Sequence, residues 1–217
     1  MTTALLQTTY FGPIQWYQKL YRYDRCVIEQ HDSYQKQTYR NRCVIATANG
    51  LQALTVPVEL RGKTEEGRDE RIEVRDVRIS DHNQWRRVHW NALQSAYSES
   101  PFFEYYADDI RPFFEKKYEF LIDFNEAIRQ KICELIDIHP QVVYSSAFSA
   151  KQSVFAEDNC QLSKDFRDVI HAKHPKEDPD FQPRSYWQVF QHRYGFQPNL
   201  SILDLLFCMG PESVFYL

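Results

Sequence analysis

The sequence predicts a mixed α/β fold in which an N-terminal βαβ unit and a β-hairpin are combined with flanking helices. Two short apolar runs, 4–8 and 26–28, flank a segment, 14–23, whose apolar residues follow helical spacing. A strand, a helix and a strand within about thirty residues favour a mixed sheet that begins with parallel strands and a right-handed crossover. The second observation is Asn49-Gly50 between two extended runs, which is typical of a hairpin with a type I′ turn.

The remaining elements continue the mixed pattern. A strand over 72–79 changes its alternation near Asp76, which indicates a bulge. Asp81 and Gln84 have the spacing of a capping box before a helix that runs to Tyr97. We expect further helices within 102–114 with a break at Pro112 and over 121–136, 164–174 and 201–209, and a buried strand over 141–146. The chain is treated as one domain, 1–217, with a possible helical sub-region over 81–137.

Composition excludes several classes of protein. A net charge of −4 and a pI near 6.0 do not favour binding to nucleic acid or to an anionic membrane. Five scattered cysteines form no C-x-x-C pair, so reduced thiols are expected rather than disulfides or a zinc site. The N-terminus does not resemble a signal peptide, and no apolar run reaches the roughly 18 residues that span a bilayer. We expect a cytoplasmic protein without a membrane span; oligomeric state is not predicted.

The segment 34–45 is the first candidate site, because it places Lys36, Arg40, Asn41 and Arg42 with two tyrosines just before the hairpin. Arginine and lysine can hold a phosphate or carboxylate, while amide and hydroxyl groups orient it. A solvated basic strand is the alternative. His89 lies on an apolar helical stripe, where it is either a general acid or base or a core histidine bonded to a carbonyl.

Other polar groups give weaker signals. Ser145 and Ser146 end a predicted strand, where α/β sheets often contact ligands. Asp168, His171 and His174 lack an identifiable fourth ligand, so no metal is predicted. Glycine-rich phosphate loops are absent from the sequence, and no cofactor is predicted. The segment 61–69 is either a solvated loop or a lid over a ligand.

Four blocks in order along the chain resemble the WbqC-like protein family. They are YFGPIQWYQKLYRYD, YQKQTYRNRCVIATANG with TVPV, HWNALQSAYSESPFF and LSILDLLFCMG. The resemblance implies a bacterial protein linked to O-antigen and other surface-polysaccharide gene clusters. The positions that match the family's motifs are Tyr10, Pro13, Lys36, Asn41, Arg42, His89, Tyr97, Ser145, Ser146 and Asp204. The chain departs from the family pattern at Gln7-Thr8, at 29–32 and at 37–39.

Two hypotheses follow from the residues and the resemblance. In the first, the protein is a transferase that acts on a nucleotide-linked or lipid-linked sugar, and His89 and Lys36 are catalytic. The ligand is then an anionic small molecule, either a nucleotide-linked sugar or an acyl donor, and the predicted binding residues are Tyr10, Asn41, Arg42, Tyr97, Ser145, Ser146 and Asp204. In the second, the same pocket belongs to a non-catalytic module that binds a metabolite or docks on a partner.

Overall fold

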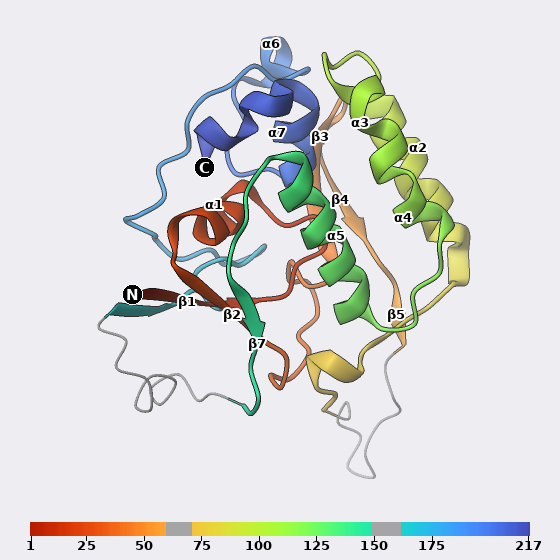
Figure 1. Cartoon of the computed structure of the whole chain (residues 1–217). Coiled ribbons are helices and arrows are strands. Elements are labelled where there is room, and N and C mark those ends of the chain that lie inside the picture. The colour runs from red at the N-terminus through yellow and green to blue at the C-terminus, as the bar shows by residue number, and fades with distance from the viewer. Residues whose placement is uncertain (60–70, 149–161) are drawn as a thin grey trace.

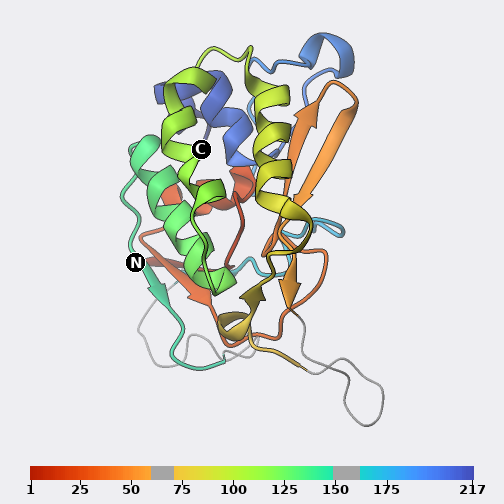
Figure 2. The same cartoon turned by 90° about the vertical axis from the view of Figure 1, so that its right-hand side faces the viewer.

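The computed structural model describes residues 1–59, 71–148 and 162–217 (Figures 1 and 2). Within them the protein is mixed α/β, with a parallel four-stranded sheet, antiparallel hairpins and flanking helices. The predicted fold class is confirmed, although parallel and antiparallel strands occupy separate sheets. The lid alternative for 61–69 lies outside the described residues.

The N-terminal βαβ unit has the predicted form. Strand β1 (Thr2–Gln7) pairs in parallel with β2 (Arg25–Glu29), and α1 (Ile14–Arg22) connects them. Ala4, Leu5 and Leu6 are all fully buried, as expected for a parallel strand that is covered on both faces. The helix also buries most of its residues, but Tyr21, which the spacing places on its inner face, is half exposed.

Two later strands complete the sheet. Strand β7 (Val142–Tyr144) pairs with β2 and strand β8 (Leu162–Asp165) pairs with β1, both in parallel, giving the order β7-β2-β1-β8. Of the four strands in this sheet, β1, β2 and β7 follow one another in one direction across it, and the last, β8, lies on the other side of β1. Such a reversal is the topological switch point of an open α/β sheet, outside whose carboxyl edge ligands usually bind.

The predicted hairpin is present, but its turn is of another kind. Strands β3 (Arg42–Thr47) and β4 (Gly50–Thr55) pair from Arg42 opposite Thr55 to Thr47 opposite Gly50. The pairing of Thr47 with Gly50 makes Ala48 and Asn49 the central residues of the turn. A type I′ turn needs positive φ at both, and neither has one, whereas Gly50 has φ of +100°. A second, short pair joins β5 (Val58–Glu59) to β6 (Arg78–Ile79).

Four helices follow and form one face of the molecule (Figure 2). They are α2 (Trp85–Tyr97), α3 (Phe103–Ile110), α4 (Pro112–Glu115) and α5 (Leu121–Leu135). The predicted capping box is wrong: Asn83 and Gln84 have left-handed backbone angles, so a 3₁₀ turn (His82–Gln84) precedes α2 and Asp81 makes no capping bond. Across the described ranges, no helix is both long and apolar enough to cross a membrane.

Several other predicted elements are corrected. The strand expected over 72–79 is a 3₁₀ turn (Val74–Asp76) followed by the short β6. The helix expected over 164–174 is absent; its first residues belong to β8, and turns follow. The strand expected to be buried over 141–146 is the shorter β7, whose central Val143 is exposed.

The C-terminal part contains α6 (Gln191–Tyr194), α7 (Ile202–Met209) and a 3₁₀ helix (Gly210–Tyr216). Helix α7 contacts α1, α3 and β3, so it lies between α1 and the hairpin (Figure 1). The Ser201 hydroxyl accepts a bond from the Leu203 N–H and begins this helix. Aromatic rings fill much of the surrounding core, including Tyr10, Phe11, Trp85, Phe114 and Phe124. Their burial indicates that these rings pack the core and do not line a cleft.

Candidate functional site

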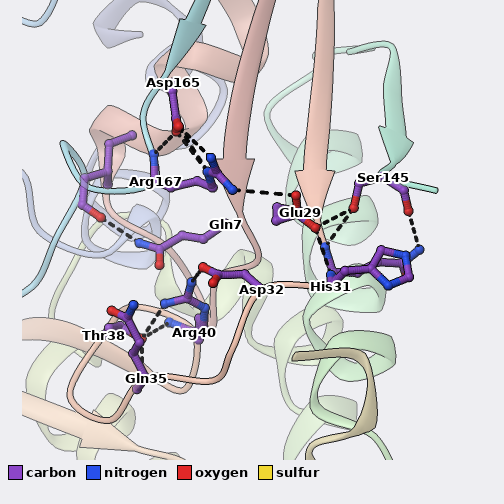
Figure 3. A network of polar contacts seen from close by, with 12 residues as sticks. Gln7, Glu29, His31, Asp32, Gln35, Thr38, Arg40, Ser145, Asp165 and Arg167 are labelled. Carbon is purple, nitrogen blue, oxygen red and sulfur yellow. Dashed lines mark hydrogen bonds and ion pairs between the residues drawn. The ribbon is translucent and has the colours of Figure 1, made fainter. Parts of the chain in front are cut away.

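Polar side chains gather along the carboxyl edge of the parallel sheet (Figure 3). Gln7 ends β1, Glu29 ends β2, Ser145 follows β7 and Asp165 ends β8. Parallel strands bring their carboxyl ends to one edge, so these four residues meet although they are far apart in sequence. We call this group the edge cluster; its members are Gln7, Glu29, His31, Asp32, Arg40, Glu73, Ser145, Asp165 and Arg167.

Glu29 connects three strand ends. Its side chain is only 1% exposed, and Oε1 accepts bonds from the Ser145 hydroxyl at 2.7 Å and the His31 N–H at 2.8 Å. Its Oε2 lies 3.6 Å from Nη1 of Arg167. Ser145 Oγ also accepts the Gln30 N–H at 3.1 Å. A buried carboxylate needs such partners, because an uncompensated charge in a low-dielectric interior is costly.

Arg167 brings the end of β8 against this carboxylate. Its Nε and Nη2 donate to Oδ1 and Oδ2 of Asp165 at 3.0 and 2.7 Å, a bidentate pair that fixes the plane of the guanidinium group. Burial opposes the charge, but Asp165, Glu29 and Asp32 outweigh it and raise the pKa of Arg167. Arg167 is therefore a fixed cation at the switch point.

Arg40 is the second buried cation of the cluster. It is 3% exposed, and its Nη2 donates to Oδ2 of Asp32 at 2.8 Å. Burial lowers the pKa of Arg40, Asp32 opposes this, and the nearby charge of Arg167 lowers it further. The Arg40 carbonyl accepts a bond from Asn125 of α5 at 2.8 Å, which holds the loop against the helix.

His31 and Glu73 form a pair at the end of β2. His31 Nδ1 lies 3.1 Å from Oε2 of Glu73, and the same oxygen lies 2.9 Å from Nε of Arg75. A carboxylate can only accept hydrogen bonds, so Nδ1 carries the proton in the neutral ring. The His31 side chain is 12% exposed.

Three polar atoms of the edge cluster are buried and have no hydrogen-bond partner among the residues that the structure describes: Oε1 of Gln7, Nε of Arg40 and Nε2 of His31. Gln7 is 1% exposed, and its Nε2 donates to the Ile170 carbonyl at 2.6 Å, which leaves its amide oxygen on the side of the Arg40 loop (Figure 3). A buried polar group without a partner costs roughly 1–3 kcal/mol. Polar atoms left without partners at the carboxyl edge of a parallel sheet indicate a candidate ligand site there, because the polar groups of a ligand can supply the missing bonds.

Two predicted site residues, Tyr10 and His89, meet in the core instead. His89 Nδ1 lies 2.9 Å from the Tyr10 hydroxyl, and its ring also bonds to the backbone of Thr55. His89 is 4% exposed beside Trp85, and burial lowers its pKa to about 4. Both ring nitrogens are occupied, so the core-histidine alternative describes this residue, and we do not propose it as a base.

Tyr97 and Asp204 form a second buried group away from the edge cluster. Asp204 is 1% exposed and accepts bonds from Tyr97 at 2.9 Å, from Tyr186 at 2.6 Å and from Gln188 at 3.0 Å. Burial raises the pKa of Asp204 more than these three donors lower it. The group joins α2, α7 and the segment before α6. Its role is therefore structural.

Replacing Asp204 with asparagine is expected to change how stability depends on pH. The carboxyl has a raised pKa in the folded state, so its contribution is complete below about pH 4, its unfolded pKa, and is lost as pH rises through the folded pKa. The neutral Asp204→Asn variant should therefore gain stability relative to the wild type between pH 4 and pH 7, measured by urea unfolding. Asp109→Asn, at an exposed position, is the control. A difference that does not vary with pH contradicts the burial of an ionisable group here.

The predicted basic segment is divided between the core and the surface. Asn41 is 5% exposed and donates to the Val56 carbonyl at 2.8 Å, which fixes the base of the hairpin. Arg42 is half-buried and donates to the Thr55 hydroxyl at 3.2 Å. Lys36 is exposed on the loop that carries Asp32 and Arg40, and Ser146 is exposed after Ser145.

The three residues considered as metal ligands are not on a helix. Asp168, His171 and His174 lie in turns instead of on a helix, and the two imidazole rings stack with centroids 5.8 Å apart. Nδ1 of His171 accepts the backbone N–H groups of Lys173 and His174. Among the described residues, no group of three or more His, Cys, Asp or Glu side chains could hold a metal ion.

The cysteines that the structure describes are free and buried. Burial raises the pKa of Cys26 and Cys43 to about 12 and that of Cys133 to about 11, and it also raises that of Cys208. Only thiolates are good nucleophiles, so these four positions do not support cysteine catalysis.

Sequence reasoning identified Ser145 and Arg40 but missed most of the edge cluster. The sequence marks Glu29 only as a departure from the family pattern, although a carboxylate at the end of a buried strand gives the same signal as Ser145. The helix expected over 164–174 does not place Asp165 and Arg167 at the sheet edge. Glu73 lies beside His31 because its segment pairs with the segment around Ser33, and no local sequence pattern predicts that pairing.

Fold and site together define an α/β protein with a candidate ligand site at the switch point of a parallel sheet. The chain belongs to the WbqC-like protein family, whose model matches residues 7–216. It is also similar to a protein of Mycobacterium tuberculosis (strain ATCC 25618 / H37Rv) described as uncharacterized protein Rv1507c. That relative is 27% identical over 229 residues, covering 99% of this chain and 96% of its own length. No solved structure matches the chain.

Proposed function

We propose that this protein is a transferase of surface-polysaccharide biosynthesis that binds a nucleotide-linked sugar at the edge cluster. The observation on which the proposal rests is the set of buried atoms of Gln7, Arg40 and His31 that lack a hydrogen-bond partner within the described residues, at the carboxyl edge of the parallel sheet. A sugar offers several hydroxyl groups, each a donor and an acceptor, which suits the amide oxygen of Gln7 and the guanidinium N–H of Arg40. Membership of the WbqC-like family supports the link to polysaccharides.

The anionic part of the ligand is proposed to lie against the segment that follows the cluster. Lys36 is exposed and Arg42 half-buried there, and both are suited to a diphosphate. Burial raises the pKa of Tyr34 to about 12, while the charges of Arg40 and Arg42 oppose the rise, so Tyr34 lies near both arginines. In this proposal Arg40 and Arg167 belong to the sugar end, Lys36 and Arg42 belong to the phosphate end, and the protein acts in the cytoplasm.

The test is a binding experiment with UDP-glucose, UDP-N-acetylglucosamine and dTDP-glucose, measured by thermal shift and by ligand-observed NMR. At least one is expected to raise the melting temperature, because a ligand that binds only the folded state stabilises it. Gln7→Met removes the unpartnered oxygen and should weaken binding about tenfold, the effect of roughly one hydrogen bond.

Gln18→Met is the matched control for this variant. Gln18 is also a buried glutamine, at 2% exposed, but it lies on α1 and bonds to the carbonyl of Asp180 and to Lys19. Its replacement should leave affinity unchanged. Equal effects of the two variants, or no effect of either, would place the sugar outside the edge cluster and contradict the proposal.

A non-catalytic binding module is the second candidate function. The burial of His89 favours it, because the base first predicted from the sequence cannot reach a substrate. The two functions differ in turnover: a transferase releases nucleoside diphosphate from the bound sugar when an amine or hydroxyl acceptor is supplied, and a module does not. Binding that depends on Gln7 without release of diphosphate across a panel of acceptors supports the module.

A further inference from the structure

The segment that carries Glu73 is fixed alongside the segment that carries His31. Tyr34 N donates to the Ile72 carbonyl at 2.8 Å, Val74 N donates to the Asp32 carbonyl at 2.9 Å, and Arg75 N donates to the Gln30 carbonyl at 3.1 Å. Ser33 and Glu73 also form an isolated antiparallel bridge. These backbone bonds set the position of the Glu73 carboxylate before any ligand binds.

His31 is held by one bond at its backbone and one at its ring. Its backbone N–H is bonded to Glu29 at 2.8 Å, and its Nδ1 is bonded to Glu73 at 3.1 Å. Arg75 lies 2.9 Å from the same Glu73 oxygen, a second contact that positions that carboxylate. An imidazole with Nδ1–H held by a carboxylate presents Nε2 as a proton acceptor.

His31 and His89 differ in what their ring nitrogens do. Both nitrogens of His89 are occupied by core partners. Within the described part of the chain, Nε2 of His31 has no hydrogen-bond partner, and it belongs to the same sheet edge as the unpartnered atoms of Gln7 and Arg40. Figure 3 shows the ring beside Ser145, on the side of the cluster away from Arg40.

From this arrangement we infer that His31 is the general base of the proposed transfer and that Glu73 is its positioning residue; the inference rests on the proposed function. The acceptor, an amine or a hydroxyl group, gives its proton to Nε2 while its lone pair forms a bond to the anomeric carbon of the nucleotide-linked sugar. The bond from that carbon to the diphosphate oxygen breaks, and its electron pair leaves with the nucleoside diphosphate. A base in this position requires a substrate with an N–H or O–H group next to the transferred sugar carbon.

The test reads the protonation of the imidazole nitrogens directly. The full chain is labelled with ¹⁵N-histidine, and long-range ¹H–¹⁵N spectra are recorded at pH 8, where imidazoles are largely neutral. Loss of one of the seven histidine signals in His31→Gln assigns the residue. The expected result is a protonated Nδ1 and an unprotonated Nε2, with the Nε2 signal shifting when UDP-glucose is added.

Glu73→Gln should change the proportion of the two tautomers at His31, because an amide can donate to Nδ1 as well as accept from it. Glu119→Gln, which replaces an exposed carboxylate paired with Arg78, should leave the His31 signals unchanged. A protonated Nε2 in the neutral ring overturns the inference. So does an Nε2 signal that stays unchanged when UDP-glucose is shown to bind. If none of the three nucleotide sugars binds, the proposed function fails and the base role fails with it.

Discussion

Replacing Arg167 with methionine is expected to lower the free energy of unfolding by about 3–5 kcal/mol at pH 7, the usual cost of removing one partner of a buried ion pair. The Arg167 side chain is 5% exposed, and its guanidinium group lies against both Glu29 and Asp165. Glu29 is 1% exposed, so water cannot take the place of the lost cation. Methionine keeps much of the side-chain volume, and the loss is therefore mainly electrostatic. Urea unfolding followed by fluorescence measures it.

Two further variants separate this explanation from a general packing defect. Arg111→Met removes a guanidinium from an exposed pair with Glu115 and should cost no more than about 1 kcal/mol. Glu29→Gln combined with Arg167→Met removes the buried negative charge as well, so the double variant should be more stable than Arg167→Met alone. A double variant that is less stable than Arg167→Met would show that Arg167 does not compensate the buried negative charge of Glu29.

The parts of the fold that the sequence predicts best are those with a local cause. The βαβ unit follows from two apolar runs around an amphipathic segment, and α5 follows from Phe124, Ile128 and Ile132 at helical spacing. The hairpin position follows from Gly50, since only glycine adopts its backbone angle readily. The turn type and the start of α2 depend on single residues with left-handed angles, such as Asn83 and Gln84, which a residue pattern does not specify.

The candidate site was harder to predict, because it is assembled by strand order. Once β8 pairs beside β1, Asp165 and Arg167 lie next to Gln7 and Glu29; a helix over 164–174 gives no such neighbour. The sequence also could not distinguish an exposed basic segment from a buried one. Arg40 and Asn41 are buried by the hairpin base and α5, whereas Lys36 in the same segment is exposed.

His89 gives the second large effect, a loss of stability in acid. Burial lowers its folded pKa to about 4, whereas an unfolded histidine has a pKa of about 6.5. Because the folded pKa is the lower one, the unfolded chain takes up the proton first. The contribution of His89 is therefore complete above about pH 6.5 and is lost as pH falls to about 4. At roughly 1.4 kcal/mol for each pH unit, the loss is about 3 kcal/mol.

His89→Gln tests this directly, because glutamine stays neutral and can still accept a bond from Tyr10 and donate one to the Thr55 backbone. Between pH 7 and pH 4 the wild type should lose about 3 kcal/mol more unfolding free energy than the variant. His139→Gln, at an exposed position, should follow the wild type. Asp204 acts in the opposite direction over part of this range, but it is present in both proteins and cancels in the comparison. Equal acid sensitivity in His89→Gln and the wild type would mean that the imidazole is open to solvent, and His89 would then return as a candidate for the base.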